Sequence, residues 1–406
     1  MSTSLISTTS LVQAPVITVK IGDYEFGKYI KTNGYSRYPN YIDSLTVTKI
    51  NGQVNTYSLV LIYPITEYND PNYFEKVFSS VSSSRRIEFS YGDMGQTEFM
   101  YREEVGIITD VKTQFMMDSA KIQYTVEAVS QGSLAGTGTY TFPARRDAKP
   151  SDVIWDLIGD PKYGLQDLFP GMRNKTRCKQ KNIIADDDLK TNLDMKANVS
   201  VLDYLQYLVD SMRSKPDSGI VKSAFYIMKF VDDTTDELGG SYLSVVKVDA
   251  KKEHPEAYEL EIGYPNSNLV YGFEVENSEN YSIYYEYQNR LNPNEYITRV
   301  TPAGDYEEVY APILSSGNSE FRTRENDQSW WTKVSQYPIK ASVSIKGLLR
   351  PAVLMSYVRL YVYFYGRKHI NSGLYIVSKQ VDTVNSSGFF TKLNLIKISN
   401  DDEGVF

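Results

Sequence analysis

Two long stretches of this chain alternate apolar and polar residues with a period of two, and a stretch with helical spacing separates them. Successive side chains of a β-strand point to opposite faces of its sheet. The alternation therefore predicts antiparallel sheets, with one buried and one wetter face, over residues 15–145 and again over residues 251–399. The clearest apolar runs are Ile17, Val19 and Ile21; Tyr57, Leu59 and Leu61; and Val358, Leu360 and Val362.

One segment of the first stretch has helical instead of alternating spacing. Asp70 is a suitable N-cap, Pro71 fits the first helical position, and four apolar residues from Phe74 to Val81 share one face. We therefore predict a helix over about residues 71–82 that packs against the sheet.

Residues 146–250 combine apolar residues at helical spacing with two short strand-like segments. They therefore predict a small α+β module. Pro150 opens a short helix, and Ser200 followed by Asp203 has the pattern of a capping box at the start of a second helix. Two strands follow, at residues 224–231 and 242–248.

The predicted fold class is mainly β with an α+β insertion between two β regions. The Ser/Thr-rich residues 1–14 predict a flexible N-terminal tail, and residues 400–406 a C-terminal tail. In the last strand, Leu393 and Leu395 share one face whereas the next two isoleucines lie on the other. This slip predicts either a β-bulge or a strand buried on both faces.

The composition leaves few routes to catalysis. The 406 residues include one cysteine and only two histidines, His254 and His369, which excludes disulfide frameworks and Cys- or His-rich metal centres. A net charge of -7 argues against binding DNA phosphates as the main role. No apolar run reaches the ~18–20 residues that a membrane span needs. We therefore expect no catalytic, cofactor-binding or metal-binding residues, no membrane insertion and no enzymatic activity.

Three features keep chemical alternatives open. The run Asp186-Asp187-Asp188 clusters oxygens as calcium prefers, but it lacks the EF-hand spacing, so we expect a solvated turn before a helix. Cys178 lies between two basic residues, which would favour a reactive thiolate, yet no partner is evident. A carboxylate pair of the kind that hydrolyses glycosides would be set in three dimensions, and no pair stands out.

Tyrosine is unusually frequent, with 34 Tyr against 3 Trp. Its rigid ring and water-tolerant hydroxyl suit interfaces that form after folding. The alternative is that Tyr is simply a common strand residue in a chain of biased composition.

Short motifs near the C-terminus resemble the last strands of a known protein family. They are carried by His369, Ser372, Gly373, Tyr375 and Val377, and then by Gly388, Thr391 and Leu393. The stretch is similar to the end of baseplate hub proteins of phage tails and related contractile injection systems. Two further runs match that family in order: Lys149-Pro150-Ser151-Asp152-Val153-Ile154 resembles the helix start after its first barrel, and Asn268–Glu274, with Phe273, resembles the strand that enters its second.

The resemblance implies two tail-tube-like β-barrels in tandem, flanking the α+β module. In that family, three copies present six barrels, so a homotrimer joins a sixfold tail tube to a threefold central spike and lines the channel for genome ejection. The implied partners are the tail tube protein, the spike, the tape-measure protein and inner baseplate or wedge proteins, with genome DNA only in transit. The implied location is the tail baseplate of the virion, after assembly in the host cytoplasm. Because the chain ends at Phe406, soon after the last strand, we expect the spike to be a separate chain.

Two other functions remain as alternatives. A carbohydrate- or receptor-binding β protein of a tail tip would use Trp330 and Trp331 in the predicted long loop 313–336 as a sugar platform. Peptidoglycan hydrolysis would need an Asp or Glu that the sequence does not single out.

Overall fold

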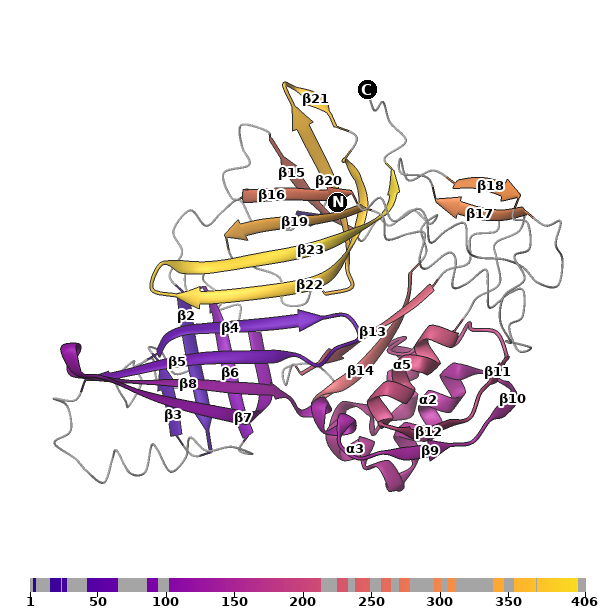
Figure 1. Ribbon diagram of the computed structural model, residues 1–406, viewed down its shortest axis with the longest axis horizontal. Helices are drawn as coiled ribbons and strands as arrows, with labels where there is room; N and C mark the ends of the chain where they lie inside the picture. Colours follow the sequence, from indigo (N-terminus) through magenta and orange to yellow (C-terminus); the bar gives the residue numbers. More distant parts are fainter. Residues whose placement is uncertain are drawn as a thin grey trace.

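A computed structural model of the chain shows two strand-rich units, one above the other in Figure 1, and a helix-rich module beside the lower one. The predicted helix over residues 71–82, the predicted loop 313–336 with its tryptophans, and His254 lie outside the described residues. The structure describes residues 3–4, 15–22, 24–27, 42–64, 86–93, 102–212, 225–232, 238–248, 257–263, 270–277, 296–300, 306–310, 339–346, 354–369 and 371–400.

The first β unit comprises the strands described between Pro15 and Ser130. Neighbouring strands are antiparallel throughout, in the spatial order β4-β5-β8-β7-β6-β2-β3. The predicted alternation is confirmed, because Val19, Ile21, Leu59 and Leu61 are all buried in one core. The strands are β2 (Pro15–Ile21), β3 (Tyr24–Gly27), β4 (Ile42–Ile50), β5 (Thr56–Pro64), β6 (Arg86–Asp93), β7 (Arg102–Met116) and β8 (Lys121–Ser130).

The module that follows has its own core, built on two helices and a hairpin. The predicted helix start at Pro150 is confirmed, and Ser200 caps the second helix by accepting a 3.0 Å hydrogen bond from the Asp203 N–H. Its longer elements are α2 (Pro150–Gly159), α5 (Val201–Ser211), β13 (Phe225–Val231) and β14 (Tyr242–Val248); its shorter ones are η3 (Gln131–Gly136), β9 (Tyr140–Phe142), β10 (Arg145–Ala148), η4 (Pro161–Tyr163), α3 (Leu165–Leu168), η5 (Pro170–Met172), α4 (Lys175–Gln180), β11 (Thr191–Leu193) and β12 (Lys196–Val199).

The module begins earlier than the sequence suggested. Ala135 and Phe142 are buried in the module core, and β9 and β10 pair with β12 and β11. The expected boundary at residue 145 therefore falls inside the module. The physical reason is that a short strand has the same period whether it pairs with the unit before it or with the module after it.

The second β unit lies in the C-terminal part of the chain and has a separate core. Its spatial order is β15-β20-β22-β23-β19-β16, and β17 and β18 form a hairpin of their own. Its strands are β15 (Tyr258–Ile262), β16 (Val270–Asn277), β17 (Tyr296–Val300), β18 (Tyr306–Tyr310), β19 (Ile339–Lys346), β20 (Tyr357–Phe364), β21 (Arg367–Lys368), β22 (Gly373–Asn385) and β23 (Gly388–Asn400).

The two β units repeat one strand plan. Six strands of the first unit, β2, β4, β5, β6, β7 and β8, correspond in chain order to β15, β16, β19, β20, β22 and β23. In both units the spatial order of these strands is first, fourth, fifth, sixth, third, second. One pairing differs: β2 and β6 are antiparallel, whereas β15 and β20 are parallel. The predicted fold class, mainly β around an α+β insertion, is confirmed.

One segment crosses from the second β unit to the first, and the N-terminal strand β1 joins the second unit. The distal half of β22 pairs antiparallel with β4, from Lys379 opposite Ile50 to Asn385 opposite Ser44. Val384 and Phe389 of the β22–β23 hairpin consequently belong to the core of the first unit. At the other end of the chain, β1 (Thr3–Ser4), within the segment expected to be a flexible tail, pairs with β15. The β22–β23 hairpin lies directly above β4 in Figure 1.

The last strand contains a β-bulge, but it lies at Ile398 and not between Leu395 and Ile396, where the sequence pattern slips. In β23, Ile398 is an extra residue between Lys397, which pairs with Tyr375, and Ser399, which pairs with Leu374. As a result, the adjacent residues Lys397 and Ile398 are both buried.

Candidate functional site

The residues that carry the C-terminal motifs gather at one corner of the second β unit. Ser372 Oγ accepts a hydrogen bond from the Val362 N–H at 3.0 Å and lies 3.2 Å from the Val362 carbonyl, to which it donates. The His369 N–H donates to the same carbonyl at 2.8 Å. Tyr375 is fully buried, and its hydroxyl donates to the Asn371 carbonyl at 2.7 Å. These bonds fix the turn that leads into β22.

The two motif glycines start the strands of the final hairpin. Gly373 and Gly388 have φ angles of 151° and 139°, which side-chain-bearing residues rarely adopt. Val377 and Leu393 are completely buried in the core of the second unit. The motif therefore encodes the geometry of a hairpin, and its His369 packs its ring edge-on against Phe364.

The other motif residues are spread over two different units. Pro150 and Val153 are buried at the start of α2, and Asp152 lies in the first turn, where the helix dipole favours a carboxylate. Phe273 lies on β16, half-buried against the core of the second unit. The structure thus brings the C-terminal motif residues together on one hairpin and places the others elsewhere.

Thr391 reveals a buried polar cluster where the two β units meet. Its hydroxyl donates to Asp382 Oδ1 at 2.6 Å, and Gln380 Nε2 donates to Asp382 Oδ2 at 2.8 Å. The Tyr91 hydroxyl, from β6 of the first unit, donates to the same Oδ2 at 3.2 Å. All four side chains are almost inaccessible to solvent. Sequence reasoning missed Asp382 and Gln380, because both sit at polar positions of an alternating strand.

A second buried cluster joins the first β unit to the module. Asn55 Nδ2 donates to Asp232 Oδ2 at 2.7 Å, and the Tyr57 hydroxyl lies 3.2 Å from that oxygen and 3.3 Å from Glu104 Oε2. Lys49 forms an ion pair with Glu104. Burial, and next the nearby Glu104, raise the pKa of Asp232 to about 7, although Lys49 and the two hydrogen bonds oppose the shift. Burial likewise raises the pKa of Tyr57 well above its ordinary value.

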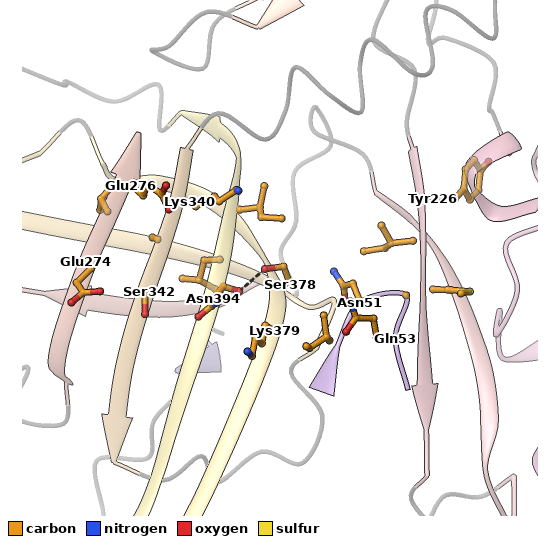
Figure 2. Close-up of a pocket in the computed structure, with 18 of the residues that line it drawn as sticks. Asn51, Gln53, Tyr226, Glu274, Glu276, Lys340, Ser342, Ser378, Lys379 and Asn394 are labelled. Carbon is orange, nitrogen blue, oxygen red and sulfur yellow. Dashed lines mark hydrogen bonds between the residues drawn. The ribbon is translucent and has the colours of Figure 1, made fainter. Parts of the chain in front are cut away.

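A cavity of about 890 Å³ opens where all three parts meet. Figure 2 shows Glu274, Glu276 and Lys340 on one wall, from β16 and β19, and Tyr226 of β13 on the opposite side. Between them, Ser378 Oγ donates to the Asn394 carbonyl at 3.0 Å. The lining mixes apolar side chains such as Ile50, Val275 and Ile396 with charged ones of both signs. It contains no hydroxyl or thiol group paired with a histidine base.

The chemical alternatives do not fit their surroundings. Asp188 is buried and accepts hydrogen bonds from the Ser151 N–H and hydroxyl, so it caps α2 from a distance; the expected solvated turn before a helix is wrong here. Cys178 is buried, its thiol donates to the Gly171 carbonyl, and burial raises its pKa, which opposes the thiolate form.

In the described ranges, no group of three or more His, Cys, Asp or Glu side chains is placed to hold a metal ion. None of the helices in those ranges combines the length and the apolar character that crossing a bilayer requires.

Solved structures with a similar fold include two tail proteins. The chain is similar to a 43 kDa tail protein of prophage MuSo2 from Shewanella oneidensis, with a TM-score of 0.54, 12% identity, and coverage of 95% of this chain and 99% of that one. It is similar to a tail protein from Neisseria meningitidis MC58, with a TM-score of 0.52, 11% identity, and coverage of 94% and 96%. A chain of the Francisella PdpA–VgrG complex matches with a TM-score of 0.51 and 10% identity, over 99% of this chain and 61% of that one. No protein-family model and no curated protein sequence matches. The fold implied by the motif resemblance is confirmed.

Proposed function

We propose that the chain is a structural protein of a phage tail or a related injection system, acting as the hub between the tail tube and the central spike. The observation that carries this proposal is the repeated strand plan: one polypeptide holds two β units with the same order of six strands. Three copies then present six units of one plan, which is the geometry that a threefold-to-sixfold adaptor requires.

The likeness of fold supports the same role. It extends over 95% of this chain and 99% of the MuSo2 tail protein, so that both β units and the module take part in the match. On this proposal the partners are two further copies of the chain, the tail tube protein, a spike on a separate chain, and neighbouring baseplate and tape-measure proteins. The location is the virion tail, and the ring encloses the channel through which genome DNA passes.

A non-enzymatic role is consistent with how the carboxyl groups are used. Asp188, Asp232 and Asp382 are the buried aspartates of the described ranges, and each accepts hydrogen bonds that join distant segments. Asp232 and Asp382 join different units, and Asp188 joins two segments of the module. None of the three is exposed in an open cleft, as paired catalytic carboxylates would be.

The proposal is tested by the symmetry of particles formed by the full chain. We expect electron microscopy of the purified protein, alone or with its tube and spike partners, to show rings of three copies with six similar lobes around a channel. A particle of another copy number, or a chain that stays monomeric even with both partners, would contradict the proposal.

A further inference from the structure

Among the described strands, β7 and β16 each have an open edge whose counterpart in the repeated plan is paired inside the chain. Beyond Ile107, the outer edge of β7 pairs with no described strand, and β16 pairs only with β19 among them. Their counterparts in the repeated plan, β22 and β4, pair with each other. Open edges of this length are templates for a further strand.

The β7–β8 and β22–β23 hairpins carry a β-bulge at equivalent residues. Thr109 is the extra residue of β7, between the pairs Ile108–Ala128 and Asp110–Glu127. Ser378 is the extra residue of β22, between the pairs Val377–Leu395 and Lys379–Asn394. Each bulged hydroxyl donates to a carbonyl of the partner strand, Thr109 to Glu127 at 3.2 Å and Ser378 to Asn394 at 3.0 Å.

The strands opposite them in the two pairings, β4 and β16, also share a β-bulge. The pairing of β4 with β5 skips Asp43, and the pairing of β16 with β19 skips Tyr271. Aligning these bulges places Phe273 where the first unit has Leu45, and Glu276 where it has Thr48. Aligning Thr109 with Ser378 places Phe115 at the position of Val384, and Lys112 at that of Val381.

We propose that β7 of one copy pairs antiparallel with β16 of a second copy of this chain, in the register that β22 and β4 use within the chain. That register sets Phe115 opposite Phe273, Lys112 opposite Glu276, and Gln114 opposite Glu274. The contact joins two different edges, so it is head-to-tail and generates a ring when the rotation closes. The inference rests on the proposed function and deepens it, since it names the surfaces by which the copies meet.

The chemistry of the two edges fits this pairing. Phe115 is 62% exposed, although its internal counterpart Val384 is buried against Leu45. Phe273 is half-buried on the core side of β16, so the pairing covers both rings with a cross-strand aromatic contact. Lys112 is exposed, as is Glu276, and opposite charges facing each other across strands are stabilising. The end of the β7–β8 hairpin projects clear of the other elements in Figure 1, as docking requires.

Charge reversal tests the register. Lys112→Glu or Glu276→Lys alone should lower the association constant of the full chain roughly two- to tenfold, because like charges would then face each other. The combined Lys112→Glu/Glu276→Lys variant should recover most of the loss. Lys121→Glu, on the neighbouring strand of the same hairpin, changes the net charge equally and should have little effect. Sedimentation at several protein concentrations, alone and with the tube and spike partners, measures all four variants.

Cysteine pairs give an independent reading of the contact. The native Cys178 is buried, so added thiols dominate the reaction with a short bifunctional maleimide. We expect Phe115→Cys/Phe273→Cys to give cross-linked species of up to three chains, whereas either single variant, or Phe115→Cys with Glu274→Cys on the opposite face, should give few.

Rings of three copies without the Phe115–Phe273 cross-link and without charge rescue would overturn the inference and leave the proposed function standing. Cross-linking by Phe115→Cys alone would indicate a β7-to-β7 dimer and also overturn it. A chain that stays monomeric with all partners would overturn both.

Discussion

At the scale of single residues, buried polar side chains lie where the units of this molecule contact one another. Asp382 accepts hydrogen bonds from Tyr91, which lies 291 residues away in the sequence, and Asp232 accepts one from Asn55, 177 residues away. Several tyrosines are buried in the cores: Tyr57, Tyr91, Tyr204, Tyr226 and Tyr375 are among the largest fully buried side chains. Some of the tyrosines thus serve the cores, and an explanation of the tyrosine content by interfaces alone is insufficient.

Thr391→Val should destabilise the protein without changing its shape. Valine fills the volume of threonine but donates no hydrogen bond, so one buried oxygen of Asp382 loses its partner at 2.6 Å. We expect a loss of about 1–3 kcal/mol in the free energy of unfolding. Chemical denaturation measures it, and Thr391→Ser, which keeps the hydroxyl, should lose less. Equal losses for both variants would contradict a role for the hydrogen bond.

Asp232 should make stability depend on pH. Its pKa is about 7 in the folded protein and about 3.9 in an unfolded chain, so the unfolded state releases this proton first as the pH rises. Its contribution to stability is therefore complete below about pH 4 and falls as the pH rises to about 7. Asp232→Asn keeps an acceptor oxygen and cannot titrate.

The variant isolates this effect from other titrating groups. Relative to the native protein, Asp232→Asn should gain stability progressively between about pH 4 and pH 7, and the difference should then level off. Denaturant unfolding of both proteins across that range measures the difference. A difference that does not change with pH would show that Asp232 is ionised throughout.

At the scale of secondary-structure elements, local chemistry explains where helices and hairpins start. Ser200 precedes α5, and its hydroxyl oxygen accepts from the Asp203 N–H and lies 2.7 Å from Asp203 Oδ2. Val201, Leu205 and Leu208 then bury one face of the helix in the module core. The helix cap and the apolar stripe of α5 both depend on residues that are close together in the sequence.

Ser200→Ala should weaken the module by removing this cap. An alanine leaves a helix N–H without its acceptor, which typically costs about 1 kcal/mol. Ser200→Asp restores an acceptor and should recover most of the stability. Thermal unfolding followed by circular dichroism compares the three proteins, and an alanine variant as stable as the native one would show that the cap is redundant.

At the scale of the whole molecule, one hairpin belongs to both β units. The β22–β23 hairpin contributes Val377 and Leu395 to the core of the second unit, and Val384 and Phe389 to the core of the first. Such sharing couples the stability of segments that are far apart in the chain.

Phe389→Ala should therefore destabilise the first β unit, although Phe389 lies in a strand of the second. The ring packs edge-on against Tyr91 of β6, with centroids 6.0 Å apart, and is nearly inaccessible to solvent. Its removal should cost about 3–5 kcal/mol. Hydrogen exchange should show faster opening of β6 as well as of β23. Protection lost in β23 alone would mean that the two units are not coupled through this hairpin.

The sequence by itself determined the types and many of the ends of the elements. Alternation and helical stripes are set by strand and helix geometry alone, and so Val19–Ile21, the cap at Ser200 and the strands near residues 225–231 and 242–248 could be predicted from their neighbours. The final hairpin was predicted differently, from the resemblance of the residues between His369 and Leu393 to the last strands of a known family.

Only the tertiary structure decided which elements meet. That β22 continues onto β4, that the module begins near residue 131, and that Asp188 caps α2 depend on contacts between segments distant in sequence. The sequence alone does not distinguish the buried Asp382 from an exposed aspartate. What distinguishes them is whether a remote partner such as Tyr91 supplies the hydrogen bonds that water would otherwise provide, and that is known only once the chain has folded.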